Sequence, residues 1–167
     1  MTLDIAIDAD PEWDSSDWSA IARSAAEAAI AESAFPQLGR GERDVELSIR
    51  LTSDDEVRAL NAEWRGKDRP TNVLSFPMSE PDDLAESAGD GPELMLGDII
   101  LARGVCLAEA AEKAIPIDHH AAHLMVHGTL HLLGYDHHDE GEADDMESRE
   151  VRALARLGIA DPYGDRG

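Results

Sequence analysis

The amino-acid sequence predicts an α+β fold, in which a single small mixed sheet of about four strands is packed with helices. Segments with the alternating pattern of strands gather in the N-terminal part of the chain, and segments with helical periodicity dominate the C-terminal part. The sequence shows no internal repeat and no linker rich in Pro, Gly or Ser. With 167 residues, the chain is long enough for one hydrophobic core. Residues 1–167 are therefore interpreted as a single domain.

Four segments have the pattern of strands. Residues 2–8 and 45–51 alternate apolar with polar side chains, as a half-buried strand does. Residues 71–77 form a third expected strand that ends at a proline, and residues 94–102 form a fourth that is apolar around a Gly-Asp pair. Between them, residues 78–93 carry six acidic residues and no basic one, and this acidic segment is expected to be a mobile loop.

Helical periodicity predicts five helices, which begin near residues 16, 53, 104, 118 and 139. Asp118 and Asp139 are expected to cap the last two, because a carboxylate at the first position accepts hydrogen bonds from free backbone N–H groups. Strands therefore come first and helices last, which is the order typical of one sheet with helices packed on it.

The helix predicted over residues 53–66 has the clearest signals. Ser53 and Glu56 have the spacing of a capping box. Its apolar face is expected to extend from Val57 to Trp64. Gly66 is suited to the left-handed residue that follows the last turn.

The charge of the chain is strongly negative. Thirty-six acidic residues face fourteen Lys and Arg residues, so the net charge is −22. Such a chain repels phosphate backbones at long range, which taken alone argues against a nucleic-acid partner. The segment WRGKDRP (residues 64–70) is an exception, since Arg65, Lys67 and Arg69 surround a single acid. A ligand responds to the local field, so this segment can still bind an anion.

Several features indicate a cytoplasmic protein without a membrane partner. No apolar run approaches the roughly 20 residues that a membrane-spanning helix needs. The acidic N-terminus lacks the positive region of a signal peptide. Cys106 is the single cysteine, so no intrachain disulfide can form, which fits a reducing compartment. Cys106 itself is expected to be a buried packing residue.

The stretch VHGTLHLLGYDHH (residues 126–138) concentrates four histidines. His127 and His131 are four residues apart and therefore share one helix face. Gly134 can adopt the left-handed conformation that ends the helix, so that the chain can return His137 to the same point. This H-x-x-x-H-x-x-G-x-x-H spacing matches that of metzincins. Three imidazoles and an open fourth position predict one catalytic zinc ion per chain.

The residue after the first histidine removes one function of such a site. In zinc proteases a Glu at this position takes a proton from the metal-bound water, and Gly128 cannot do so. Proteolysis is therefore disfavoured, whereas other metal-assisted hydrolysis remains open. Asp136 or Asp139 could supply a base, although Asp136 is better suited to orient a ligand ring from outside the coordination sphere. His123 and His138 are candidates for a fourth ligand.

Three blocks of the sequence resemble one known family. HGTLHLLGYDH (residues 127–137) resembles the signature HGxLHLxGYDH of the YbeY family of bacterial endoribonucleases. LNAEWRGKDRPTNVLSFP (60–77) is similar to the family's LNxxYRGKDxPTDVLSFP, and LGDIILA (96–102) is similar to its LGDIxI strand. The blocks occur in the family's order, and the resemblance extends over roughly residues 45–157.

The resemblance implies a zinc-dependent endoribonuclease that is specific for single-stranded RNA. It implies a role in ribosomal RNA maturation, chiefly at the 3′ end of the small-subunit RNA, and in ribosome quality control. Expected partners are RNA, the small ribosomal subunit and assembly factors. The zinc ligands would be His127, His131 and His137, and the catalytic residues would be Arg65 and His127.

The chemistry of RNA cleavage is compatible with this assignment of Arg65. Negative charge develops on the phosphorus centre, and a guanidinium can bind two phosphate oxygens at once. Lys67 and Arg69 would position the backbone phosphates of the substrate. The alternative for Arg65 is a cation that complements the dipole of its own helix. The sequence departs from the family pattern at Trp64, where Tyr or Phe is common, and at Asn72, where Asp is common.

Two other functions fit the same residues. The protein could be a non-catalytic ribosome-assembly factor whose zinc holds the fold, in which case a fourth protein ligand would close the site. It could also be a zinc hydrolase of a peptide or amide, with a base outside the histidine helix. For the nuclease itself, the sequence leaves two nucleophiles open: a metal-activated water and the ribose 2′-hydroxyl.

Overall fold

The computed structural model describes residues 3–13, 17–34, 44–78, 94–136 and 139–162. Most of the predicted acidic loop, residues 79–93, lies outside these ranges. The described residues confirm the predicted α+β class. The elements follow one another as β1 (Leu3–Ala9), a 3-10 helix η1 (Pro11–Trp13), α1 (Trp18–Ala31), β2 (Val45–Thr52), α2 (Asp54–Arg65), β3 (Val73–Pro77), β4 (Leu94–Ala102), α4 (Arg103–Lys113), α5 (Ile117–Leu132) and α6 (Glu140–Arg156).

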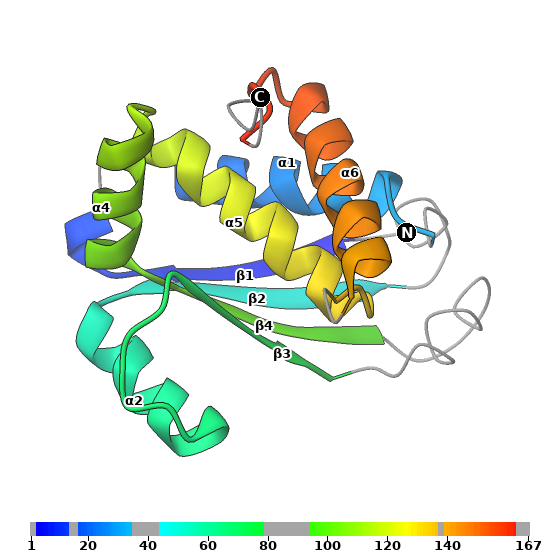
Figure 1. Cartoon of the computed structure of the whole chain (residues 1–167). Helices are drawn as coiled ribbons and strands as arrows, with labels where there is room; N and C mark the ends of the chain where they lie inside the picture. The colour runs from blue at the N-terminus through cyan, green and yellow to red at the C-terminus, as the bar shows by residue number, and fades with distance from the viewer. Residues whose placement is uncertain (1–2, 14–16, 35–43, 79–93, 137–138, 163–167) are drawn as a thin grey trace.

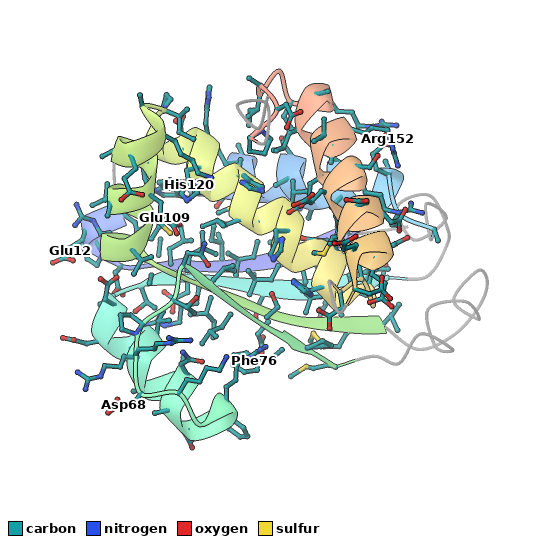
Figure 2. All side chains as sticks on the ribbon, in the orientation of Figure 1. Glu12, Asp68, Phe76, Glu109, His120 and Arg152 are labelled. Atoms are coloured by element: carbon teal, nitrogen blue, oxygen red, sulfur yellow. The ribbon has the colours of Figure 1, made fainter. Side chains whose placement is uncertain are left out.

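The four strands form one mixed sheet in the order β1-β2-β4-β3. β1 pairs with β2 and β2 with β4 in parallel, whereas β3 runs antiparallel to β4 along the edge. Helices α1, α5 and α6 cover one face, and α2 lies on the other (Figure 1). Figure 2 shows Phe76 and Asp68 on the side of α2, and His120 and Glu109 on the opposite side. Of the described helices, none is long and apolar enough to cross a membrane.

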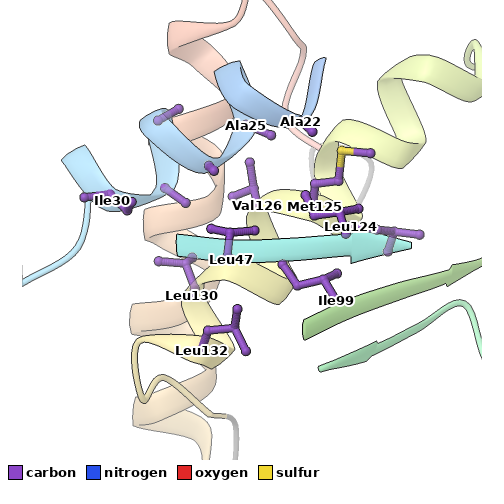
Figure 3. Packing of buried hydrophobic residues seen from close by; sticks show 14 of the residues in the cluster. Ala22, Ala25, Ile30, Leu47, Ile99, Leu124, Met125, Val126, Leu130 and Leu132 are labelled. Atoms are coloured by element: carbon purple, nitrogen blue, oxygen red, sulfur yellow. The ribbon is translucent and has the colours of Figure 1, made fainter. Parts of the chain in front are cut away.

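The main core lies between the sheet and the layer of α1, α5 and α6. Alternate residues of the central strands, such as Leu47 and Ile99, point toward α5, which contributes Met125, Val126 and Leu130 (Figure 3). Each of these five side chains is at most 1% exposed. Burial of one such side chain contributes about 1.5–3 kcal/mol. Helix α5, which carries the histidines, is therefore fixed in the centre of the molecule.

A second, smaller core joins α2 to the opposite face of the sheet. The expected signals at both ends of this helix are present: the Ser53 hydroxyl accepts the N–H of Glu56 at 3.2 Å, and Gly66 is left-handed, with φ 69°. The expectation that the apolar face extends to Trp64 is wrong. The face ends at Leu60, and Trp64 is 66% exposed. The buried members of this core are Val57, Leu74, Ile100 and Ala102.

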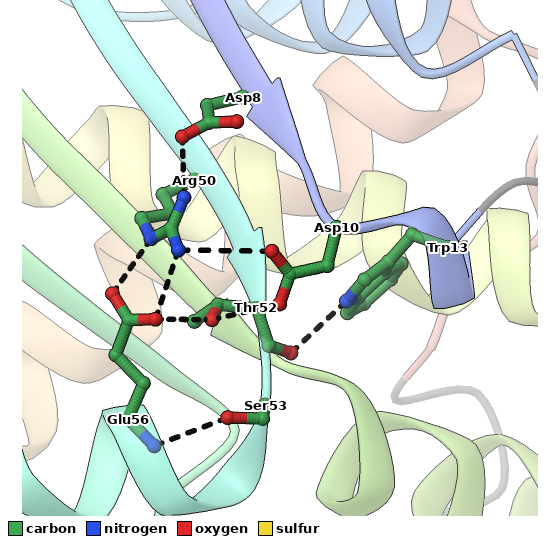
Figure 4. A network of polar contacts seen from close by, with 7 residues as sticks. All are labelled: Asp8, Asp10, Trp13, Arg50, Thr52, Ser53 and Glu56. Atoms are coloured by element: carbon green, nitrogen blue, oxygen red, sulfur yellow. Dashed lines mark hydrogen bonds and ion pairs between the residues drawn. The ribbon is translucent and has the colours of Figure 1, made fainter.

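A polar network connects β1, β2 and α2 (Figure 4). The Arg50 guanidinium donates to both carboxylate oxygens of Glu56, at 2.6 and 2.9 Å, and also pairs with Asp8 and Asp10. The Thr52 hydroxyl donates to Glu56 at 2.6 Å. The hydrogen bond from Arg50 holds the pKa of Glu56 below its usual value. The Glu56 carboxylate thus binds β2 instead of completing the expected capping box.

The two later caps have different outcomes. Asp139 caps α6 as expected, since its carboxylate accepts the N–H of Glu142 at 2.8 Å. Asp118 does not cap α5, because the helix begins at Ile117 after Pro116, two positions earlier than a cap at Asp118 would place it. Proline fixes its own φ near the helical value, so it can precede a helix without a side-chain cap.

Cys106 is a buried packing residue, as expected. Its side chain is inaccessible to solvent on α4, and burial raises the pKa of its thiol to about 12. A thiol with so high a pKa is a poor nucleophile at neutral pH. Cysteine chemistry is therefore no part of the candidate site.

Candidate active site

A cleft of about 740 Å³ opens where the end of α2, the edge strand β3 and the end of α5 meet. The three elements lie far apart in sequence, and the sheet brings them together. Residues on both sides of the cleft belong to the blocks singled out in the sequence. Its lining includes Arg65, Thr71, Asn72, Ser75, Met78, His127, His131, Tyr135 and Asp136.

His127 and His131 converge in this cleft as their spacing predicts. Their Nε2 atoms are 3.0 Å apart, and the ring centroids are separated by 4.5 Å with an interplanar angle of 79°. Both residues lie on the last two turns of α5. The packing of that helix on the sheet therefore fixes the direction of both rings.

A buried carboxylate on α6 holds the first of these rings. Oε1 of Glu150 lies 2.7 Å from Nδ1 of His127 and 3.3 Å from Nε2 of His123, and Glu150 is 1% exposed. Burial would raise the pKa of Glu150, but its hydrogen bonds to the two histidines prevail and hold that pKa at about 2. The ionised carboxylate can only accept, so Nδ1 of His127 is the donor. The other ring nitrogen of His127, Nε2, then carries no proton and presents its lone pair to the cleft.

This arrangement fits a metal-binding imidazole. Metal-bound histidines commonly donate the second ring N–H to a carboxylate, which fixes the tautomer. The Nε2 atoms of His127 and His131 are 3.0 Å apart, and that of His127 presents a lone pair. Both atoms are therefore placed to bind the same cation. The expected third ligand, His137, lies outside the described residues, as does His138. Within the described ranges, no group of three His, Cys, Asp or Glu side chains is placed to hold a metal ion.

The sequence did not single out Glu150, although a signal for it was present. On α6, Glu150 is four residues after Met146 and four before Leu154, so it shares their inward face. An acidic residue at such a position must be paired, because burial of an isolated charge is costly. The sequence predicts the role of orienting a ligand for Asp136, which lines the cleft. That role of Asp136 stays a prediction.

The turn after α5 has the predicted form. Gly134 has a φ of 98°, and its N–H donates to the carbonyl of His131 at 3.0 Å. The N–H of Tyr135 donates to the carbonyl of Leu130 at 3.0 Å. The helix therefore ends at Leu132, one residue after His131, and the chain turns back beside the cleft.

The absence of a side chain at Gly128 is required by packing, and it also means that this residue cannot act as an acid or a base. A Cβ at this position would lie 2.9–3.2 Å from three atoms of the Ile99 side chain on β4. Position 128 therefore points into the sheet, where a glutamate would be buried in the core. The general base of a zinc protease has no room at this position.

Arg65 reaches the cleft from the other side of the sheet. Gly66 ends α2, and Nη2 of Arg65 donates to the carbonyl of Ser75 on β3 at 2.9 Å. The guanidinium carbon lies 5.7 Å from the ring centroid of Phe76. Arg65 is thus directed across the edge strand toward His127 and His131. A cation that only complemented the dipole of its own helix would not need this contact with β3.

Lys67 and Arg69 are exposed and do not line the cleft. They belong to the short segment after α2, which two hydrogen-bonding residues hold in place. Nδ2 of Asn61 donates to the carbonyl of Arg69 at 2.8 Å, and Arg58 binds both carboxylate oxygens of Asp68 at 2.8 and 3.2 Å.

Asn72, one of the departures from the family pattern, connects the cleft to the interior. Its Nδ2 donates to Oε1 of Glu109 on α4 at 3.1 Å, and the same oxygen is 2.8 Å from Nε2 of His120 (Figure 2). Burial lowers the pKa of His120, against the effect of Glu109. An aspartate at position 72 would place a second carboxylate beside Glu109, whereas the amide supplies a donor.

The fold and the cleft together define a class of small α+β protein, in which a central helix presents histidines to a cleft opposite an arginine. A family model described as Endoribonuclease YbeY matches residues 6–158. The chain belongs to the YbeY family.

Curated relatives agree with this assignment over nearly the full length. An Endoribonuclease YbeY of Rhizorhabdus wittichii is 54% identical over 164 residues, which cover 96% of both chains. Another of the same description, from Novosphingobium aromaticivorans, is 53% identical and covers 94% of this chain and 93% of its own. A solution structure of a Thermotoga maritima protein is similar in fold, with a TM-score of 0.55 and 23% identity, over 92% of this chain and 91% of that one.

Proposed function

We propose that this protein is a zinc-dependent endoribonuclease that cleaves single-stranded RNA. The observation that carries the proposal is the convergence of two imidazoles, 3.0 Å apart at Nε2, in the same cleft as Arg65. Its relatives are described as endoribonucleases, which supports RNA as the substrate. Gly128 argues against proteolysis, because position 128 faces Ile99 and has no room for the side chain of a general base.

His127, His131 and His137 would hold the zinc ion. When bound, the ion would supply a Lewis acid that polarises a water molecule or the scissile phosphate. Glu150 supports this ligand set, since it keeps the proton of His127 on Nδ1 and leaves Nε2 for the metal. Asp136, in the cleft lining, is proposed to orient a ligand from outside the coordination sphere.

Arg65 is proposed to stabilise the negative charge that develops on the phosphate. The carbonyl of Ser75 occupies one guanidinium donor and the face of Phe76 orients the group, so the position of Arg65 is set before the substrate binds. A donor that is already oriented loses little entropy when it binds an anion. Lys67 and Arg69, outside the cleft, are proposed to bind backbone phosphates of the substrate away from the cleaved bond.

The biological setting follows from the family resemblance. We propose that the substrate is ribosomal RNA, chiefly the 3′ end of the small-subunit RNA, and that the protein also acts in ribosome quality control. The small subunit and assembly factors would be its partners in the cytoplasm. Residues 1–167 would act as a single domain.

Two variants test the proposal on protein of defined metal content. His131→Ala should lose both bound zinc and cleavage of single-stranded RNA, because it removes a ligand. Arg65→Ala should keep the zinc and the fold and lose cleavage by about 100-fold or more, as is usual when a donor to developing charge is removed. Arg65→Lys keeps the positive charge but cannot bind a phosphate in the bidentate manner of arginine, so we expect it to retain only part of the cleavage activity.

Each alternative function predicts a different result. Wild-type protein that holds one zinc ion yet leaves single-stranded RNA intact would contradict the nuclease and favour an assembly factor. A fourth protein ligand in the zinc coordination sphere would favour the same conclusion. Unchanged cleavage in Arg65→Ala would remove Arg65 from the mechanism and leave the metal site in place.

A further inference from the structure

Trp64 differs from the other two tryptophans of the chain. Trp13 and Trp18 are 3% and 6% exposed and pack edge to face, whereas Trp64 is 66% exposed. Its helix, α2, buries Val57 and half-buries Leu60 against the sheet, but the core ends there. Figure 1 shows the C-terminal end of α2 farther from the sheet than its beginning. An indole ring therefore lies open to solvent one residue before Arg65.

The charges around Trp64 are unlike those of the rest of the molecule. Residues 58–69 contain four basic residues and two acidic ones, although the whole chain carries −22. Asp68 is engaged by Arg58, so its charge is compensated. Glu63 is the remaining exposed acid of this segment. Lys67 and Arg69 are thus left as exposed cations three and five residues after Trp64 along the chain.

Elsewhere in the described part of the chain, arginines are mostly paired with carboxylates. The paired carboxylates neutralise positive charge that could otherwise attract a polyanion. The arginines concerned, apart from Arg58, are Arg23, Arg50, Arg149, Arg152 and Arg156. The C-terminal end of α2 and the residues that follow it are therefore the place in the described structure where exposed cations and an exposed tryptophan occur together.

We infer that Trp64, with Lys67 and Arg69, forms a subsite outside the cleft on which a base of single-stranded RNA stacks. This inference rests on the proposed function. Open aromatic rings next to cations are the usual means of binding single strands, because every base has a face that can stack and every linkage carries a phosphate. Arg65 is adjacent in sequence and lines the cleft, so a strand bound there can continue toward Trp64.

A protein partner fits this surface less well than a nucleic acid. A large exposed apolar patch marks many protein interfaces, whereas the residues that follow Trp64 through Arg69 are charged or glycine. The subsite also reconciles the acidity of the chain with an RNA substrate. The ring contributes attraction that does not depend on charge, and the cations act over the short range that salt leaves unscreened.

The chain offers a direct optical test, because Trp64 is the exposed tryptophan and the other two are buried. The probe is a single-stranded oligoadenylate of about 12 nucleotides with phosphorothioate linkages, which slow cleavage. It should quench the emission of the wild-type protein. Quenching should be lost in Trp64→Phe, whereas the affinity measured by anisotropy should be nearly kept. Trp64→Ala should weaken binding by about 5-fold or more, the usual effect of removing one stacked base.

Leu107→Ala, on an exposed residue of α4, is the matched control and should bind as the wild type does. Equal affinity of Trp64→Ala and wild type, or no quenching by bound probe, would overturn the subsite. In cleavage assays Trp64→Ala should raise KM for long substrates, and much less for oligonucleotides of about 4 nucleotides. Quenching by the probe in a wild-type protein that never cleaves RNA would support the subsite and contradict the proposed function.

Discussion

Oε1 of Glu150 lies 2.7 Å from Nδ1 of His127, and this contact connects two helices that approach the candidate metal site from different directions. His127 is on α5, which packs on the sheet, whereas Glu150 is on α6, which packs on α5. The carboxylate is buried, and it also contacts His123. The orientation of a proposed zinc ligand therefore depends on the docking of the last helix.

Replacement of Glu150 should weaken zinc binding. We expect Glu150→Gln to lower zinc affinity by about 10–100-fold, since the amide oxygen can still accept from Nδ1 but the charge is gone. Glu150→Leu should lower it further, because the tautomer of His127 is then free. Chelator competition measures the affinity, and NMR of the imidazole nitrogens reports the tautomer.

Glu109→Gln is the matched control for this experiment. It removes another carboxylate that binds a histidine, namely His120 in the first turn of α5, at the opposite end of the helix from His131. Zinc affinity should be unchanged in this variant. If Glu150→Gln bound zinc as tightly as the wild type, with the His127 tautomer unaltered, the proposed role of Glu150 would be wrong.

Gly128→Ala should destabilise the protein by about 1–3 kcal/mol. The new methyl group would lie 2.9 Å from Cγ2 of Ile99, and overpacking of a filled core typically costs this much. Urea unfolding measures the loss. Ile99→Val in the same chain should recover part of it by removing a methyl group from the contact.

Gly141→Ala provides the opposite case on α6. A Cβ at Gly141 would be in ordinary contact with Asp139 at 3.4 Å, so the helix preference of alanine should prevail. We expect stabilisation of up to about 1 kcal/mol. Similar effects at both positions would show that helix propensity, and not the approach of Ile99, decides the residue at 128.

Glu32 should make stability depend on acid pH. Its carboxylate accepts from Arg156 at 2.6 Å and from Arg152 at 3.0 Å, which joins the end of α1 to α6. These bonds, chiefly the one from Arg156, hold the pKa of Glu32 below the usual value of a glutamate. A carboxyl whose pKa is lowered by folding stabilises the protein above its unfolded pKa. That stability disappears as the pH falls through the folded pKa.

Glu32→Gln should therefore cost about 0.5–1 kcal/mol at pH 7, as for other ion pairs with exposed arginines. The difference from wild type should shrink as the pH falls below 4.5. Unfolding free energies across this range measure the effect. A difference that stays constant with pH would show that the carboxylate charge is not responsible.

Local rules predicted the elements well, and long-range contacts explain where they failed. The strands, the glycine after α5 and the convergence of His127 and His131 depend on spacing along one segment. The position of Trp64 depends instead on where the sheet ends beneath α2, which no local pattern records. The spacing of α6 does place Glu150 on the inward face, but its partners His123 and His127 are on another helix, so the contact itself could not be predicted. Asp118 was displaced as a cap by the proline before it.

The edge strand β3, from Val73 to Pro77, separates the two halves of the candidate active site. Arg65 binds its backbone from one side, and the histidines of α5 lie on the other. Short edge strands are among the first parts of a sheet to open locally. Opening of β3 would release Arg65 while His127 and His131 stayed together on their buried helix. Mild denaturation should thus produce a protein that still binds zinc but no longer cleaves RNA.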